Sequence, residues 1–189
     1  MSQDVVVVRR AIRARPATVF AFFTDRDRWL SWQGHTAEID PRPGGVFRMN
    51  VRGDGWASGR FTVVEPPRRI AFTWGWEGDA SPVPPGSSAV EVTFEPDGVG
   101  GTLLTLVHSG LPLLAVDMHR DGWIHYVGRL VVRARAAIRA PTPRRPDRTA
   151  DQSRGHRAPG GPAGLISTTI STRTCPGGPA LPVYAYAPQ

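Results

Sequence analysis

A run of short strand-like segments followed by one long amphipathic helix constrains the fold of this chain most. Six segments are rich in β-branched and aromatic residues and are separated by glycine or proline turns: 35–40, 46–51, 56–65, 68–76, 89–95 and 102–109. Apolar residues then recur at helical spacing within residues 114–140, at Val116, Trp123, Val127, Leu130, Ala134 and Ala137. Short turns between strands predict an antiparallel sheet, and the apolar stripe predicts that the helix covers one of its faces.

The N-terminal part adds one strand and two short helices to this pattern. Residues 5–12 form a β-branched segment that ends before Pro16, and Pro16 suits the first turn of a helix over 17–24. A second short helix is predicted over 27–32, with Trp29 and Trp32 on one face. The predicted class is therefore α+β, with a curved antiparallel sheet around a long C-terminal helix and two short helices after the first strand.

Alternation along the strands gives this sheet an aromatic inner face. Residues at every second position share a face in three strands: Ile70, Phe72, Trp74 and Trp76; Val90, Val92 and Phe94; and Leu104, Leu106 and His108. A twisted sheet that curves around a helix need not close fully against it, so we expect an apolar cavity with a few polar groups between them. Gly122 beside Trp123 predicts a close approach of the helix backbone to another element.

The composition changes sharply after Ala140, which predicts a domain over 1–140 and a tail over 141–189. The tail holds nine prolines and six glycines without a period, and a segment of this kind buries too little apolar surface to fold. It also carries six arginines and two acidic residues, so more than half of the net charge of +7 lies there. Because these arginines lack aromatic neighbours and a motif, we expect a solvated basic tail and no specific nucleic-acid site.

Membrane insertion, a targeting segment and metal chemistry find no support in the sequence. No apolar run approaches the roughly 20 residues that span a bilayer, and the N-terminus lacks the pattern of a signal peptide, so a cytoplasmic location is expected. Cys175 is the single cysteine, so a zinc site built from cysteines is not expected. His119 and His125 are six residues apart, which places them on different helix faces. We expect no metal and no cofactor.

The order and spacing of several short motifs resemble a known family over about residues 5–138. The chain is similar to the activator of heat-shock protein 90 ATPase homologue-like domain, a branch of the START-like (SRPBCC) superfamily with the helix-grip, Bet v-like fold. The resemblance rests on segments 15–20, 43–47, 59–67, 69–74, 101–105 and 108–111, with Trp29, Trp32, His119, Gly122 and Trp123. Each motif is weak alone, and their order together is specific.

This resemblance implies a binding module for a small hydrophobic molecule, held between the sheet and the long helix. The predicted lining residues are Trp32, Phe47, Phe72, Trp74, Trp76, Leu106, His108, Trp123 and Val127. Superfamily relatives bind lipids, sterols or polyketides, and some are cyclases or hydrolases, so an enzyme is one alternative. A chaperone-type interaction module is another, although it is not favoured, and a homodimer is left open.

His108 is the ionisable residue on which the enzyme alternative depends. Its alternation with Leu104 and Leu106 places it at the inward end of the last strand, 102–109. There it is either a core histidine bonded to backbone, or a polar anchor or general acid–base in the pocket. Catalysis would need a second group, and Asp40, Arg48, Arg60 and Glu65 are the candidates.

Overall fold

The computed structural model describes residues 5–51, 53, 55–79 and 81–139. The predicted tail over 141–189 lies outside the described residues. The elements follow the expected order, with the bounds β1 (Val6–Ile12), α1 (Pro16–Thr24), α2 (Arg26–Leu30), β2 (Thr36–Ile39), β3 (Val46–Asn50), β4 (Trp56–Glu65), β5 (Arg69–Trp74), β6 (Ser88–Pro96), β7 (Thr102–Ser109) and α3 (Leu113–Arg139).

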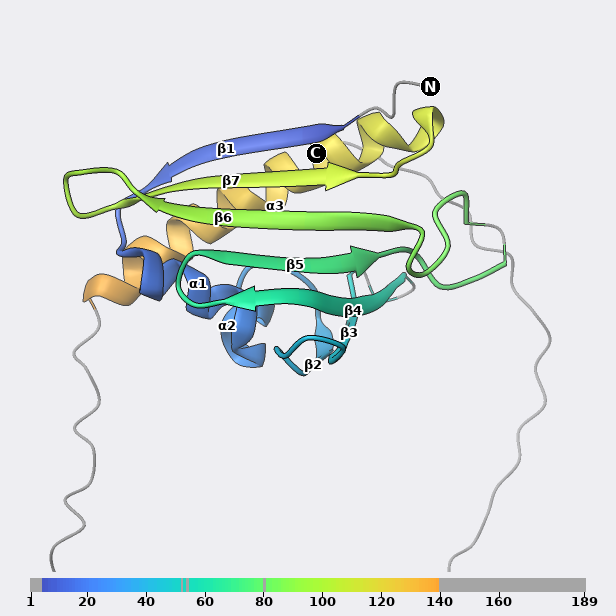
Figure 1. Cartoon of the computed structure of the whole chain (residues 1–189), viewed down its shortest axis with the longest axis horizontal. Coiled ribbons are helices and arrows are strands. Elements are labelled where there is room, and N and C mark those ends of the chain that lie inside the picture. The colour runs from blue at the N-terminus through green and yellow to red at the C-terminus, as the bar shows by residue number, and fades with distance from the viewer. Residues whose placement is uncertain (1–4, 52, 54, 80, 140–189) are drawn as a thin grey trace, which may run out of the picture. The chain divides into compact units, whose positions relative to one another are not determined.

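The seven strands form one antiparallel sheet in the order β1-β7-β6-β5-β4-β3-β2 (Figure 1). Consecutive strands from β2 to β7 are neighbours, as short turns require, and β1 pairs with β7 with Val6 opposite His108. The register shifts between Phe61 and Val63, where β4 pairs with β5. Such a bulge increases local twist and bends the sheet. The sheet therefore has the predicted antiparallel topology, with its first strand added at the edge beside the last.

Glycine is required where β4 passes closest to β5. A Cβ atom at Gly59 would lie 1.9 Å from the carbonyl oxygen of Thr73, far inside van der Waals contact. The hydroxyl of Thr73 also accepts a hydrogen bond from the backbone nitrogen of Arg60, at 2.9 Å. The absence of a side chain at Gly59 thus lets the two strands approach at this point.

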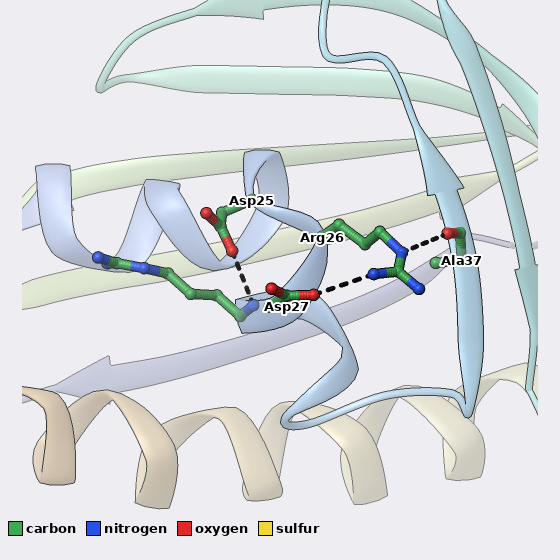
Figure 2. A network of polar contacts seen from close by, with 5 residues as sticks. Asp25, Arg26, Asp27 and Ala37 are labelled. Atoms are coloured by element: carbon green, nitrogen blue, oxygen red, sulfur yellow. Dashed lines mark hydrogen bonds and ion pairs between the residues drawn. The ribbon is translucent and has the colours of Figure 1, made fainter. Parts of the chain in front are cut away.

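Polar contacts cap the second short helix, α2, and fasten it to β2 (Figure 2). The Asp25 carboxylate accepts a hydrogen bond from the backbone nitrogen of Arg28 at 2.9 Å, which caps α2. The Arg26 guanidinium donates to the Ala37 carbonyl of β2 at 2.9 Å and to Asp27 at 3.1 Å. Because the cap is Asp25, α2 begins at Arg26, one residue before the predicted start, and it ends at Leu30.

The long helix α3 runs along one face of the sheet and presents the predicted apolar stripe to it (Figure 1). Val116, Trp123, Val127, Leu130 and Ala134 are buried, as expected from their spacing. His119 belongs to the same stripe, because it follows Val116 by three residues and precedes Trp123 by four. Ala137 was expected in the stripe but is exposed, so the buried face ends one turn earlier.

The prediction of a close approach at Gly122 is wrong. A Cβ atom added at Gly122 would meet nothing within 4 Å outside the neighbouring backbone of its own helix. The residue is partly buried beside Trp123, and the indole of Trp123 makes the contact with the sheet. Gly122 therefore leaves open space where a small side chain would fit.

The strand predicted over 68–76 is also shorter than expected. β5 ends at Trp74. The backbone nitrogen of Trp76 donates a hydrogen bond to the carbonyl oxygen of Val83 in the following loop, at 2.7 Å. Trp76 nevertheless stays beside β4, where it forms an isolated bridge with Ala57. The aromatic alternation of Ile70, Phe72 and Trp74 is confirmed, since all three are buried.

Candidate functional site

Three tryptophans and two histidines meet between the sheet and α3. We call this group the His–Trp cluster: Trp74 at the end of β5, Trp76 in the segment that follows it, His108 in β7, and His119 and Trp123 in α3. The ring centroids of His108 and His119 lie 5.1 Å apart, and those of Trp74 and Trp123 lie 5.3 Å apart. Trp74 also packs edge-on against Trp76 at 5.6 Å. The curved sheet and the helix thus bring together five ring side chains, four from β5, β7 and α3 and one from the segment after β5.

The hydrogen bonds of His108 determine which of its two ring nitrogens carries the proton. The indole nitrogen of Trp123 donates to His108 Nδ1 at 3.0 Å, so Nδ1 must carry a lone pair. Nε2 therefore bears the proton and donates to the Ser88 hydroxyl at 2.8 Å. That hydroxyl donates in turn to the carbonyl oxygen of Trp74, at 2.9 Å. Both ring nitrogens of His108 are engaged, and the three hydrogen bonds form one continuous chain from α3 through β7 and β6 to β5.

His119 has the opposite tautomer. The indole nitrogen of Trp76 donates to His119 Nε2 at 3.1 Å, which leaves the proton on Nδ1. Nδ1 then donates to the Ala115 carbonyl, four residues earlier in α3, at 2.7 Å. Each histidine of the cluster is therefore held in one tautomer by a tryptophan from another element.

Burial keeps both histidines neutral. Desolvation and, to a smaller extent, the neighbouring His119 together lower the pKa of His108 from its ordinary value near 6.5 to about 3. Desolvation also lowers the pKa of His119, while its hydrogen bond to Ala115 acts in the opposite sense. At neutral pH neither imidazole carries a charge, and neither has a free nitrogen lone pair.

Trp74 is the exception in this otherwise satisfied network. Its side chain is 2% exposed, and its indole nitrogen is buried without a hydrogen-bond partner. A buried donor of this kind costs about 1–3 kcal/mol when it stays unpaired. The cluster therefore contains one unused N–H group.

The other predicted lining residues are buried in the same core. Phe47, Phe72, Leu106 and Val127 are fully buried, and the Phe47 ring lies 5.7 Å from that of Trp74. Trp76 is only partly buried, so it marks the outer edge of the cluster. The sequence therefore grouped residues that the fold brings into one core, although burial alone does not make them a ligand site.

Trp32 lies in a second group of rings beside the short helices. Its ring stacks on Trp29 at 5.5 Å and contacts Phe23 at 5.1 Å. Its indole nitrogen donates to the carbonyl oxygen of Phe22, at 3.1 Å. Trp29 joins this group to Phe47, and Phe47 joins it to Trp74. Trp32 thus holds α2 against α1, while the His–Trp cluster lies beyond Phe47.

The acidic and basic side chains that could have assisted His108 point elsewhere. Arg48 makes a two-pronged ion pair with Glu77, at 2.7 and 2.8 Å, and lies over the Trp56 ring at 4.0 Å. That hydrogen bond lowers the pKa of Glu77. The remaining candidates bond to other groups: Asp40 to Arg42, Arg60 to the carbonyl of Gly44, and Glu65 to Arg69. None of these four hydrogen-bonds to His108.

Sequence reasoning missed His119 and Ser88 as partners of the site. His119 was noted as a motif residue, and its spacing from Val116 and Trp123 could have placed it on the buried stripe. Ser88 stands opposite Trp74 in the β5–β6 pairing, and no residue pattern in the sequence marks it. Within the described residues, no group of three His, Cys, Asp or Glu side chains could hold a metal ion.

A curved antiparallel sheet with a long C-terminal helix and two short helices after β1 defines the helix-grip fold of SRPBCC proteins. Within that class, the chain belongs to the family described as Activator of Hsp90 ATPase homolog 1-like protein, whose model matches residues 13–134. In the part of the chain that the structure describes, no helix has the length and apolarity needed to cross a membrane.

Solved structures agree with this assignment. An AHSA1-like protein from Rhizobium etli is 41% identical, covering 82% of this chain and 96% of that one, with a TM-score of 0.58. CalU16 from Micromonospora echinospora is 27% identical over 72% of this chain and 80% of its own, with a TM-score of 0.58. DynU16, described as a putative protein in the dynemicin biosynthetic locus, is 27% identical over 72% of this chain and 49% of its own, with a TM-score of 0.62. No curated protein matches the chain.

Proposed function

We propose that this protein binds a small hydrophobic molecule between the sheet and α3, at the His–Trp cluster. The observation that carries the proposal is the unpartnered Trp74 nitrogen inside an otherwise satisfied ring cluster. Flat aromatic side chains favour flat apolar ligands, and a few fixed polar groups give orientation. The similarity to DynU16, from a biosynthetic locus, supports a role in handling small molecules.

We infer that a ligand would enter the cluster beside Trp76, its least buried member. Trp76 is partly buried, and its hydrogen bond to His119 joins the segment after β5 to the first half of α3. The Arg48–Glu77 ion pair fastens the next residue of that segment to β3. We infer that a ligand reaches the interior by breaking the Trp76–His119 contact.

A binding screen with the whole chain tests the proposal. Hydrophobic metabolites are added to the purified protein, and thermal unfolding and native mass spectrometry report binding. A true ligand raises the unfolding temperature progressively with its concentration and gives a complex with one ligand per chain. Absence of any stabilising compound across sterol, fatty-acid and polycyclic aromatic classes would count against the proposal.

Matched tryptophan substitutions locate the binding site of any ligand found. Trp123→Phe removes a ring edge and a donor from the cluster, so affinity should fall about 2- to 10-fold. Trp56→Phe makes the same substitution outside it, beneath Arg48, and should leave affinity unchanged. Equal losses in the two variants would place the ligand elsewhere.

The enzyme alternative loses its main support in this structure. His108 has no hydrogen-bonded acid or base among the described residues, and its Nδ1 lone pair is occupied by Trp123. A general base needs a free lone pair within reach of the proton that it removes. A cyclase or hydrolase activity would have to use groups outside the His–Trp cluster.

A chaperone-type interaction is the second candidate function, and one observation favours it. Leu113, Leu114 and Met118 at the start of α3 are exposed, the first two by more than three quarters. Exposed apolar residues of this kind can mark a protein contact. If this contact exists, Leu114→Ser should weaken binding to an Hsp90 chaperone in a titration, whereas Val132→Ser on the exposed side of the same helix should not.

A further inference from the structure

We propose that the ligand is a neutral molecule with an acceptor oxygen, and that Trp74 Nε1 donates a hydrogen bond to that oxygen. This inference rests on the proposed binding function and specifies the class of ligand. It assigns to Trp74 the role of anchor and to the surrounding rings the role of shape selection.

The balance of donors and acceptors in the cluster leads to this assignment. Both indole donors of Trp76 and Trp123 reach histidine nitrogens, and both histidine protons reach oxygens. The Ser88 proton reaches the Trp74 carbonyl. One donor, Trp74 Nε1, is left over, and every histidine lone pair is used. A ligand that fits this balance brings an acceptor and no donor of its own.

A water molecule fits this position less well than a ligand oxygen. Buried water usually makes about three hydrogen bonds, and its two protons need acceptors. The histidine lone pairs of the cluster already accept from tryptophans, so within the cluster a water bound to Trp74 could donate its protons only to oxygens that already accept one hydrogen bond. A carbonyl or ether oxygen has no proton and needs no such acceptor.

The charge of the cluster excludes an ionised ligand. Its members are three indoles and two neutral imidazoles, and the nearby ion pair of Arg48 and Glu77 is already closed on itself. A carboxylate or ammonium group placed there would lose its hydration without meeting an opposite charge. The ligand class is therefore a neutral ketone, quinone, ester or ether on an apolar frame.

Matched pairs of ketones and hydrocarbons test the anchor directly. Affinity for the full chain is measured by tryptophan fluorescence for acetophenone with ethylbenzene and for fluorenone with fluorene. The two members of each pair have similar shape and differ in the acceptor oxygen. We expect each ketone to bind about 2- to 10-fold more tightly than its hydrocarbon, which is the range for one net hydrogen bond.

Trp74→Phe should abolish that preference, because it removes the donor and keeps an aromatic ring. Trp56→Phe is the matched control and should retain it. The indole ¹⁵N–¹H spectrum gives an independent readout. The Trp74 signal, assigned by its loss in Trp74→Phe, should move downfield with the ketone and much less with the hydrocarbon.

The outcomes separate this inference from the proposed function. Equal binding of ketone and hydrocarbon to the unsubstituted protein would overturn the anchor and leave the binding function standing. A preference that survives in Trp74→Phe would also overturn it. If no compound of either pair binds and the screen above finds none, the proposed function fails, and the anchor fails with it.

Discussion

His108 organises the core through the hydrogen bonds of both its ring nitrogens. Its strand position predicted an inward-facing imidazole, and the structure confirms that it is fully buried. Its partners are side chains, Ser88 and Trp123, and not the backbone. A neutral imidazole that accepts on one side and donates on the other can join three elements through directed bonds.

The buried histidines make stability depend on pH. The pKa of folded His108 lies below its unfolded value, so the unfolded chain takes up a proton first as the pH falls. The contribution of buried, neutral His108 to the free energy of unfolding is fully present above about pH 6.5. It is lost progressively as the pH falls from there to about 3. Between pH 6 and 5 each such histidine contributes a slope of up to about 1.4 kcal/mol per pH unit.

His108→Asn should remove one histidine's share of that slope. The measurement is the free energy of unfolding from urea titrations at several pH values between 5 and 7. His125→Asn, which replaces an exposed histidine of α3, is the control and should keep the slope of the unsubstituted protein. An unchanged slope in His108→Asn would show that His108 is not held neutral in the folded state.

At the scale of single elements, two glycines have opposite roles. Gly122 lies inside α3 with open space where a Cβ atom would point, whereas Gly59 lies against the backbone of Thr73. Alanine at Gly122 should stabilise the protein by about 0.5–1 kcal/mol, because glycine weakens a helix interior.

Alanine at Gly59 should have the reverse effect. Its Cβ would lie 1.9 Å from the Thr73 carbonyl oxygen, so β4 and β5 must separate. We expect a loss of several °C in the thermal midpoint, measured by circular dichroism alongside Gly122→Ala. A destabilised Gly122→Ala variant, or a neutral Gly59→Ala variant, would contradict this account of the two sites.

The strands and the long helix could be predicted from the sequence because apolar residues recur at a different spacing in each: every second residue in a strand, and every three or four residues in a helix. Alternation in β5 and the spacing of Val116, Trp123 and Val127 in α3 identify the buried faces directly. The hydrogen bonds of the site could not be predicted in this way. Ser88 meets His108 only because β6 lies between β5 and β7, and the unpaired Trp74 nitrogen emerges only when all neighbouring donors are placed.

For the whole molecule, the division into a domain over 1–140 and a tail stays a prediction. The described elements end at Arg139, and the family match ends at residue 134. A chain cut after Ala140 should therefore unfold cooperatively with the same thermal midpoint as the full chain, within about 2 °C, since a 1 kcal/mol change in a domain of this size moves it by several degrees. A larger drop would show that residues beyond 140 stabilise the domain.

The pairing of β1 with β7 has a consequence for how the chain is made. Val6 and His108 are partners across the sheet although roughly a hundred residues separate them, and contacts so distant in sequence form late. On the ribosome, the first strand must wait at the tunnel exit until the last strand has emerged. The His–Trp cluster is therefore assembled only near the end of synthesis, when α3 follows β7 and brings Trp123 to His108.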